Sequence, residues 1–280
     1  MEKLIEHYNK FNEDKRLKSR HGEVEFRVSM KYIHRYLNQI RDEYVNKEGC
    51  SESVKMSEAE ANSQIKILDV GAATGAYSIP LAEEGYEVHA IELVKHNVQR
   101  LRAKSDKVHA LQGNALKLSK KYEKEYFDLV LIFGPMYHLF TYEDKFKVIE
   151  EAKKVTKENG IIMIAYLMED YALVKHGFIE NTIGESVAHK KVDINYNIMS
   201  TEDDLYDYSS LETIYKLAED SGLERINIFT PDGPANYIRN SLREMSEESY
   251  ELFVGYVEKI AERKDLLGAA GHTVDVLRKK

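Results

Sequence analysis

Residues 65–75 join an apolar strand pattern to a turn that contains two glycines. The segment reads Ile-Lys-Ile-Leu-Asp-Val-Gly-Ala-Ala-Thr-Gly, and the acidic residue Glu92 follows 21 residues after Gly71. A strand, a glycine-hinged turn and an acidic residue at the end of the next strand form the layout of adenosine-binding α/β domains. We therefore expect residues 65–75 to form the first strand and the ligand-binding turn of such a domain.

Asp69 distinguishes between two kinds of adenosine ligand. It lies two residues before Gly71, where dinucleotide-binding strands normally carry an apolar residue. Gly71 and Gly75 have no side chains that would crowd the turn. A carboxylate at position 69 therefore suits a zwitterionic amino-acid tail better than a pyrophosphate, which is itself an anion. The segment therefore favours a cofactor with an amino-acid tail over a nicotinamide dinucleotide.

From residue 65 onward, strand patterns alternate with helix patterns. Because such alternation produces a parallel sheet covered by helices on both faces, we expect an α/β fold. Residues 127–133 are almost purely apolar, which predicts a buried central strand. The expected strands are 65–70, 87–93, 108–112, 127–133, 161–167, 223–229 and about 272–277, and the expected helices include 97–103, 142–158 and 211–220.

The first 45 residues have a helical pattern. Apolar residues recur there at spacings of four and three, in the order Phe26, Met30, Ile33, Leu37, Ile40 and Tyr44. We predict a helical cap over residues 1–45, folded over the carboxyl ends of the strands, and a mobile linker over the polar residues 46–64. The main domain is expected over 65–280, with insertions at 168–208 and 234–265.

Four consecutive expected strands end in residues suited to ligand binding. Glu92 ends the second strand, where it can accept hydrogen bonds from both hydroxyls of a ribose. Gly113-Asn114-Ala115 follow the third strand, where an amide can read the amino group of adenine. Residues 134–139 (Gly-Pro-Met-Tyr-His-Leu) follow the fourth strand. Because ligands of open α/β sheets bind outside the carboxyl ends of the strands, these residues predict one shared site.

The motif at Asp69 resembles the first motif, D/E-x-G-x-G-x-G, of the class I S-adenosylmethionine-dependent methyltransferases. The segments beginning at His21 (HGEVEFRVSM), Gly134 (GPMYHL) and Thr230 (TPDGP) resemble a UbiE-like bacterial group of mostly unassigned small-molecule methyltransferases. The resemblance implies a Rossmann-like, seven-stranded, mostly parallel sheet, S-adenosylmethionine as cofactor and S-adenosylhomocysteine as product. It implies cofactor contacts by Asp69, Gly71, Gly75, Glu92 and Asn114-Ala115, to which we add Ala72, Ala73, Leu93 and Phe133.

Two positions depart from the patterns of this superfamily. Ala73 stands where the first motif usually has glycine, and we expect a slight backbone shift to tolerate its methyl group. Gly134 stands where methyltransferases of nucleobase amines carry Asp or Asn, so an exocyclic amine lacks its usual hydrogen-bond acceptor. The second departure argues against a nucleic-acid acceptor.

His138 and Tyr137 are the candidate catalytic residues. Methyl transfer is an in-line displacement at a sulfonium, which needs alignment of the reacting atoms and exclusion of water. A base is needed where the acceptor carries a proton at neutral pH, and histidine titrates in that range. We expect His138 to act as a base or to orient its loop, and Tyr137 to form the wall of the methyl site or to pack beneath the next helix.

Composition narrows the class of acceptor. The net charge of −8 opposes binding to nucleic acid, and the single cysteine, Cys50, excludes a disulfide framework and a thiolate zinc cluster. No apolar run approaches the ~20 residues of a membrane span, and the charged N-terminus lacks a signal-peptide pattern. We expect a cytoplasmic enzyme with a small-molecule acceptor and no membrane partner. An RNA- or protein-modifying methyltransferase and a non-catalytic cofactor-binding module stay open as alternatives, as does the oligomeric state.

The remaining histidines give weaker signals. His89 and His109 fall inside expected strands, which favours packing over catalysis. His21 has no convincing metal-ligand spacing with Glu23, Glu25 or any other cluster, so we predict no metal site.

Overall fold

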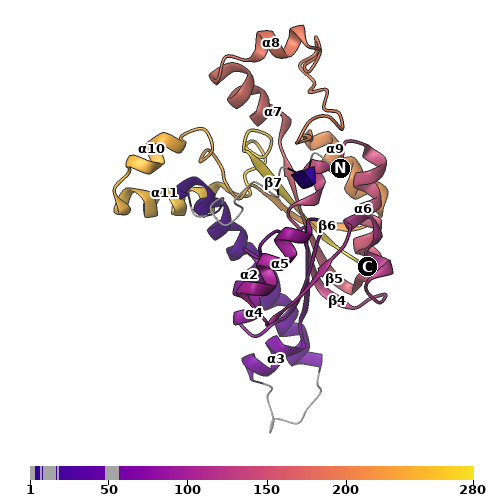
Figure 1. The fold of residues 1–280 in the computed structure, drawn as a ribbon. Coiled ribbons are helices and arrows are strands. Elements are labelled where there is room, and N and C mark those ends of the chain that lie inside the picture. Colours follow the sequence, from indigo (N-terminus) through magenta and orange to yellow (C-terminus); the bar gives the residue numbers. More distant parts are fainter. Residues whose placement is uncertain (1–3, 7, 9–16, 18, 48–56) are drawn as a thin grey trace.

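A computed structural model describes residues 4–6, 8, 17, 19–47 and 57–280 of the chain. Its centre is a seven-stranded sheet with the strand order β3-β2-β1-β4-β5-β7-β6 (Figure 1). Strand β7 is antiparallel to both of its neighbours, and all other neighbouring pairs are parallel. The predicted seven-stranded, mostly parallel α/β fold is confirmed. The strands are β1 (Lys66–Val70), β2 (Glu87–Glu92), β3 (Val108–Gln112), β4 (Phe127–Ile132), β5 (Thr156–Leu167), β6 (Glu224–Phe229) and β7 (His272–Arg278).

Each face of the sheet carries its own apolar core. Side chains of β4 alternate between the two, with Leu129 and Leu131 in the first core and Val130 and Ile132 in the second, as a strand buried on both faces requires. The first core is covered by α2 (Arg20–Lys47), α4 (Ser78–Glu83), α5 (Lys95–Lys104), α10 (Arg239–Glu244) and α11 (Glu247–Ile260). The second core is covered by the 3-10 helix η2 (Ala115–Lys120), α6 (Tyr142–Val155) and α9 (Leu211–Ser221).

Helix α2 lies along one face of the sheet. Ile33 and Leu37 of its apolar stripe are fully buried in the first core. Near its C-terminal end, the hydroxyl of Tyr44 donates to Oδ1 of Asp128 at the amino end of β4 (2.8 Å), whereas His21 lines a cavity at the opposite end of the sheet. The helix therefore covers a face of the sheet, and only its first turns reach the strand ends that residues 1–45 were expected to cap. The division into domains stays a prediction.

The segment expected to be a linker, residues 46–64, is partly helical. Helix α2 continues to Lys47, and a short helix, α3 (Glu58–Gln64), precedes β1. The Ser57 hydroxyl accepts from the backbone N–H of Glu60, whose carboxylate accepts in return from the backbone of Ser57, forming a capping box. This local motif and the burial of Ala61 explain why the polar sequence folds here. The centre of the expected linker, 48–56, lies outside the described residues.

Strand β5 begins earlier than expected. Helix α6 ends at Val155, and Thr156 is already extended (φ −81°, ψ 135°) and paired with Phe127 of β4. The buried hydroxyl of Thr156 donates to the carbonyl of Ala152 in the last turn of α6 (2.7 Å). The polar residues that follow conceal this start, because they read as a continuation of the amphipathic helix.

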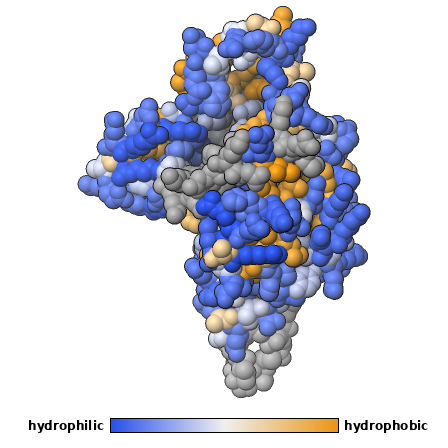
Figure 2. Space-filling view, viewed as in Figure 1, coloured by the Kyte–Doolittle hydropathy of each residue, from blue (hydrophilic) through white to orange (hydrophobic). Residues whose placement is uncertain are grey.

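Residues 168–208 leave the sheet after β5 as an arm, at the top of Figure 1. The arm contains α7 (Glu169–Ala172), the π-helix η4 (Leu173–Ile179) and α8 (Ile183–Ala188). Figure 2 shows hydrophobic side chains on its surface. The large exposed apolar residues of the arm are Val174, Phe178, Ile179, Val187, Ile194, Tyr196 and Met199. In the part of the chain that the structure describes, no helix is both long and apolar enough to cross a membrane.

Candidate functional site

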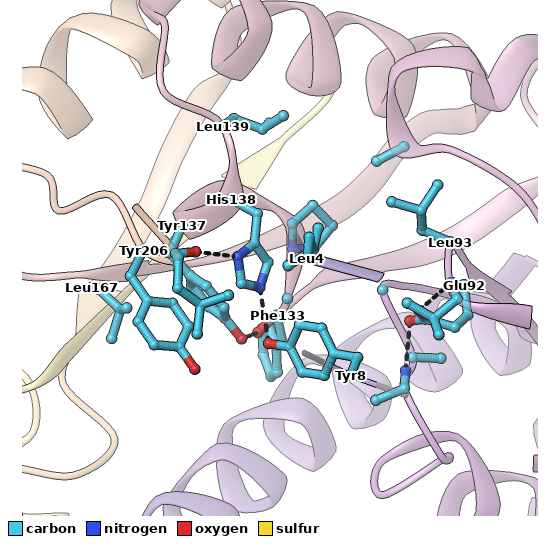
Figure 3. Close-up of a pocket in the computed structure, with 18 of the residues that line it drawn as sticks. Leu4, Tyr8, Glu92, Leu93, Phe133, Tyr137, His138, Leu139, Leu167 and Tyr206 are labelled. Carbon is cyan, nitrogen blue, oxygen red and sulfur yellow. Dashed lines mark hydrogen bonds between the residues drawn. The ribbon is translucent and has the colours of Figure 1, made fainter. Parts of the chain in front are cut away.

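A cavity of about 850 Å³ lies at the carboxyl ends of the central strands. Its wall combines the turn after β1, the end of β2, the loop after β3, the 3-10 helix η3 (Pro135–His138) after β4, and parts of the arm. Figure 3 shows Glu92 and Leu93 on one side of Tyr8, and His138, Tyr137 and Tyr206 on the other. The structure thus brings the expected cofactor residues and the candidate catalytic residues into one cavity. Their binding and catalytic roles stay predictions. The expected site residues that line the cavity are Asp69, Gly71, Ala72, Ala73, Glu92, Leu93, Asn114, Ala115, Phe133, Tyr137 and His138.

The loops after β1 and β4 approach each other closely. A Cβ atom built on Gly71 would lie 2.8 Å from Cδ of Pro135, and a Cβ on Gly134 would lie 2.9 Å from the carbonyl oxygen of Gly71. Glycine at 134 therefore has a packing reason, because a side chain there would collide with the backbone of the neighbouring turn. The close approach places η3 directly beside the turn that follows Asp69 and β1.

Gly75 is the expected cofactor residue that does not line the cavity. Its backbone is left-handed (φ +88°), and a Cβ there would lie 2.3 Å from Cδ1 of Leu101 in α5. Ala73 in the same turn is also left-handed (φ +46°), which is unfavourable for a residue with a Cβ. Gly75 thus allows the turn to pack on α5, and its expected contact with the cofactor stays a prediction.

Glu92 links the two loops of the expected cofactor side. Its Oε2 accepts from the backbone N–H of Ala73 (3.0 Å) and its Oε1 accepts from the N–H of Val94 (2.8 Å). The carboxylate is therefore held in a fixed orientation at the cavity wall. Asn114 is fixed in a similar way, because its Oδ1 accepts from the N–H of Leu116 and caps η2 (2.9 Å).

Asp69 is a buried carboxyl group at the base of the turn. Its side chain accepts a hydrogen bond from the Ser78 hydroxyl (2.5 Å), and the residue is 2% exposed. Burial raises the pKa of Asp69 to about 6, the Ser78 hydrogen bond opposes this rise, and the nearby charge of Glu92 adds to it. A cation bound beside Asp69 would relieve the cost of ionising it, since an opposite charge favours the ionised form.

Asp69→Asn is expected to stabilise the ligand-free protein by about 2–3 kcal/mol at pH 8. The folded-state pKa of Asp69 lies above its ordinary value of 3.8, so ionisation destabilises the folded state. The penalty is fully present above about pH 6 and disappears as the pH falls below 3.8. Asparagine can still accept the Ser78 hydrogen bond. Urea unfolding of both proteins at pH 4, 6 and 8 measures the difference, and a constant difference across this range would contradict the argument.

His138 is held by hydrogen bonds at both ring nitrogens. Its Nδ1 lies 2.9 Å from the carbonyl oxygen of Leu205, and its Nε2 lies 2.9 Å from the hydroxyl of Tyr8 (Figure 3). Because a carbonyl can only accept, Nδ1 carries the proton in the neutral ring and Nε2 is the basic nitrogen. The structure therefore presents the basic nitrogen of His138 to the side of the cavity that contains Tyr8.

Tyr137 contributes its ring to the cavity and its hydroxyl to the loop. The hydroxyl donates to the carbonyl of Phe133 (3.0 Å), and the ring meets those of His138 and Tyr206 edge-on. The backbone N–H of Asp207 donates to the carbonyl of Tyr137 (2.9 Å). The arrangement fits the predicted wall of the methyl site better than a core position beneath the next helix.

A buried ion pair, which sequence analysis did not predict, fastens the arm to α6 beside the end of η3. Nζ of Lys145 lies 2.5 Å from Oδ2 of Asp207 and also donates to the carbonyl of Leu139. Both side chains are largely buried, so the pair is not weakened by water as a surface pair would be. Together with the Leu205 carbonyl, the pair fixes where the arm meets His138.

Other histidines lie in different surroundings. His89 on β2 and His109 on the edge strand β3 are neighbours (4.8 Å between ring centroids), and His89 contacts Glu87 on its own strand (2.9 Å). His176 lines the cavity and contacts Glu180. Across the described ranges, no three His, Cys, Asp or Glu side chains are grouped as a metal ion would require.

Comparison with known proteins identifies the family. A family model described as a methyltransferase domain matches residues 61–221, which is more than half of the chain. A ubiquinone biosynthesis O-methyltransferase of Pelagibacter ubique (strain HTCC1062) is 30% identical over 144 residues, covering 49% of this chain and 56% of that protein. A glycine/sarcosine N-methyltransferase of Parasynechococcus marenigrum (strain WH8102) is 27% identical over 133 residues, covering 46% and 47%. The chain thus spans about half the length of the curated relatives it matches.

The fold is also that of solved methyltransferases. A crystal structure of an S-adenosylmethionine-dependent methyltransferase from Methanosarcina mazei superimposes with a TM-score of 0.50 and 14% identity, over 76% of this chain and 92% of that chain. At this level of identity the likeness shows the fold alone. The chain belongs to the methyltransferase-domain family and has the α/β fold of the class I S-adenosylmethionine-dependent methyltransferases.

Proposed function

We propose that this protein transfers a methyl group from S-adenosylmethionine to a small-molecule acceptor. One observation carries the proposal: a single cavity holds the carboxylates of Asp69 and Glu92 on one side and the His138 imidazole on the other. The first side offers groups for an amino-acid tail and a ribose. The second side, beyond β4, offers a base and aromatic walls for an acceptor.

The residues of the cavity have distinct tasks in the proposed reaction. S-adenosylmethionine, when bound, supplies an electrophilic methyl group. Asp69 and Glu92 orient the donor, and the rings of Tyr137 and Tyr206 exclude water from the acceptor side. His138 accepts the proton of an acceptor hydroxyl at Nε2, while the Leu205 carbonyl holds the ring in the required tautomer.

The acceptor that this site suits is small. A cavity of about 850 Å³ must hold both the donor and the acceptor, within the usual size range of small-molecule sites. The net charge of −8 disfavours RNA. The two curated relatives are named for ubiquinone biosynthesis and for glycine and sarcosine, all of which concern small molecules. Cytoplasmic location stays a prediction, and the oligomeric state stays open.

Titration calorimetry tests the choice of cofactor. We expect micromolar binding of S-adenosylhomocysteine and no measurable binding of NAD. Glu92→Ala should weaken the binding of S-adenosylhomocysteine by about 1.5–3 kcal/mol, the value of hydrogen bonds to a charged group. Glu87→Ala is the matched control, because Glu87 lies on the same strand and is absent from the cavity wall. Tighter binding of NAD than of S-adenosylhomocysteine would overturn the proposal.

A further inference from the structure

The cavity extends past His138 to the ends of β5 and β7. His272, the first residue of β7, pairs with Leu167 at the carboxyl end of β5, and both residues line the cavity. In the strand order, β4 separates these strands from β1 and β2, which carry Gly71 and Glu92. This far end therefore lies on the acceptor side of the cavity, away from the proposed cofactor residues.

Arg239 is the permanent cation of this far end. Among the lining residues that the structure describes, it is the one arginine or lysine. Its Nε and Nη2 donate to Oδ1 of Asn236 (3.0 and 2.6 Å). It forms no ion pair with a carboxylate of the described residues, so the neutral amide of Asn236 positions the guanidinium without cancelling its charge.

A chain of buried hydrogen bonds fixes that position. Asn236 is 5% exposed, and its Nδ2 donates to Oδ2 of Asp232 (2.7 Å), which is fully buried. Asp232 also accepts from the Thr230 hydroxyl and from Nδ1 of His272 (3.1 and 2.8 Å). Asp232, in the turn Thr230-Pro-Asp-Gly-Pro, thus fixes the side chain of Asn236, and Asn236 in turn positions Arg239.

A second feature, the Tyr171 hydroxyl, lies beside Arg239. Tyr171, just after β5, lines the cavity and is 4% exposed, yet its buried hydroxyl has no hydrogen-bond partner among the described residues. Burial raises the pKa of Tyr171 to about 12 and the nearby Arg239 guanidinium opposes this rise, so the hydroxyl keeps its proton at neutral pH and can donate it. An unsatisfied buried hydroxyl is costly unless a ligand supplies the missing acceptor.

The other titratable groups of this end limit the charge that a ligand can carry. Burial, aided by Arg239, lowers the pKa of His21 to about 4, so this histidine adds no positive charge near pH 7. Glu25 also lines the cavity, and its carboxylate lies 3.8 Å from Nδ1 of His272. One guanidinium beside a carboxylate suits a ligand with one negative charge better than a phosphate dianion.

We propose that Arg239 and Tyr171 bind a carboxylate of the methyl acceptor, so that the substrates of this protein are small carboxylic acids. The inference rests on the proposed methyl transfer and names its substrate class. A carboxylate matches the planar guanidinium, and its oxygens can accept from both Arg239 and the Tyr171 hydroxyl. Bound there, it would hold the acceptor at one end and leave its nucleophilic atom free to reach the His138 side.

Nuclear magnetic resonance tests the subsite without knowledge of the full substrate. Protein with ¹⁵N-labelled arginine is titrated with acetate, and the Nε–H signal of Arg239 is assigned by its loss in Arg239→Gln. We expect acetate to shift this signal saturably in the millimolar range and acetamide to leave it unmoved. Tyr171→Phe should weaken acetate binding about three- to ten-fold. Arg243→Gln is the matched control, because Arg243 lies exposed on the same helix and is absent from the cavity wall.

The outcomes separate this inference from the proposed function. A signal that acetate does not move, or that acetamide moves equally, would overturn the subsite. Saturation by inorganic phosphate at lower concentration than by acetate would replace the carboxylate with a phosphate. Calorimetry with S-adenosylhomocysteine should give affinities within two-fold for wild type and Arg239→Gln. A loss of more than about ten-fold in the variant would assign Arg239 to the cofactor tail and overturn the inference. No binding of S-adenosylhomocysteine by wild type would defeat the methyl-transfer proposal, and with it the assignment of the ligand as a methyl acceptor, while the acetate titration would still decide whether the carboxylate subsite exists.

Discussion

Gly75→Ala should destabilise the protein by about 2–5 kcal/mol. About 1–2 kcal/mol of this comes from forcing a residue with a Cβ into a left-handed backbone (φ +88°). The remainder, about 1–3 kcal/mol, comes from overpacking, because the new Cβ would lie 2.3 Å from Cδ1 of Leu101 and 3.0 Å from Cγ1 of Ile79. Domains of this kind have a total stability of roughly 5–15 kcal/mol, so the loss is a large share. Urea denaturation followed by circular dichroism measures it.

Gly85→Ala separates the two contributions. Gly85 is also left-handed (φ +92°), but a Cβ there would meet no atom within 4 Å. Its replacement should therefore show the backbone cost alone, about 1–2 kcal/mol. Equal losses for the two variants would show that Gly75 is needed only for its backbone conformation, and that its packing on α5 contributes nothing measurable.

Local patterns explain why the sheet and one side of the site were predictable. The apolar run of β4 is buried along its whole length, and Glu92 ends β2 as the spacing from Gly71 predicted. Strand periodicity and turn glycines are set by neighbours in the chain, so they can be read without the fold. The start of β5 was missed because Thr156 follows an amphipathic helix directly.

The contacts on the acceptor side of the cavity could not be predicted from local sequence patterns. The Leu205 carbonyl that orients His138 is 67 residues away in the chain, and Asp207 is 62 residues from Lys145. Arg239 has no local motif that marks it as a cavity residue. These contacts depend on how the arm and the segment after β6 return to the strand ends, which no periodicity encodes.

His138→Ala is expected to lower turnover on an acceptor hydroxyl by about 100-fold or more, with the affinity for S-adenosylhomocysteine changed by no more than a few-fold. The Leu205 carbonyl holds the imidazole in one tautomer, so Nε2 is the proton acceptor, at which the hydroxyl of the substrate takes the place of the Tyr8 hydroxyl. The ring nitrogens of His138 contact the Leu205 carbonyl and the Tyr8 hydroxyl, and neither of these residues is proposed to hold the cofactor. The assay uses an acceptor found by screening metabolites against the protein loaded with S-adenosylhomocysteine.

Tyr137→Phe serves as the matched control for this loss, because its hydroxyl donates to the Phe133 carbonyl within its own loop (3.0 Å). That variant should keep turnover within a few-fold. If His138 is a base, the rate of the wild type should fall as the imidazole is protonated at low pH, and His138→Ala should lack that fall. An unchanged rate in His138→Ala would remove the base and leave alignment and exclusion of water as the mechanism, which is the behaviour that a neutral amine acceptor requires.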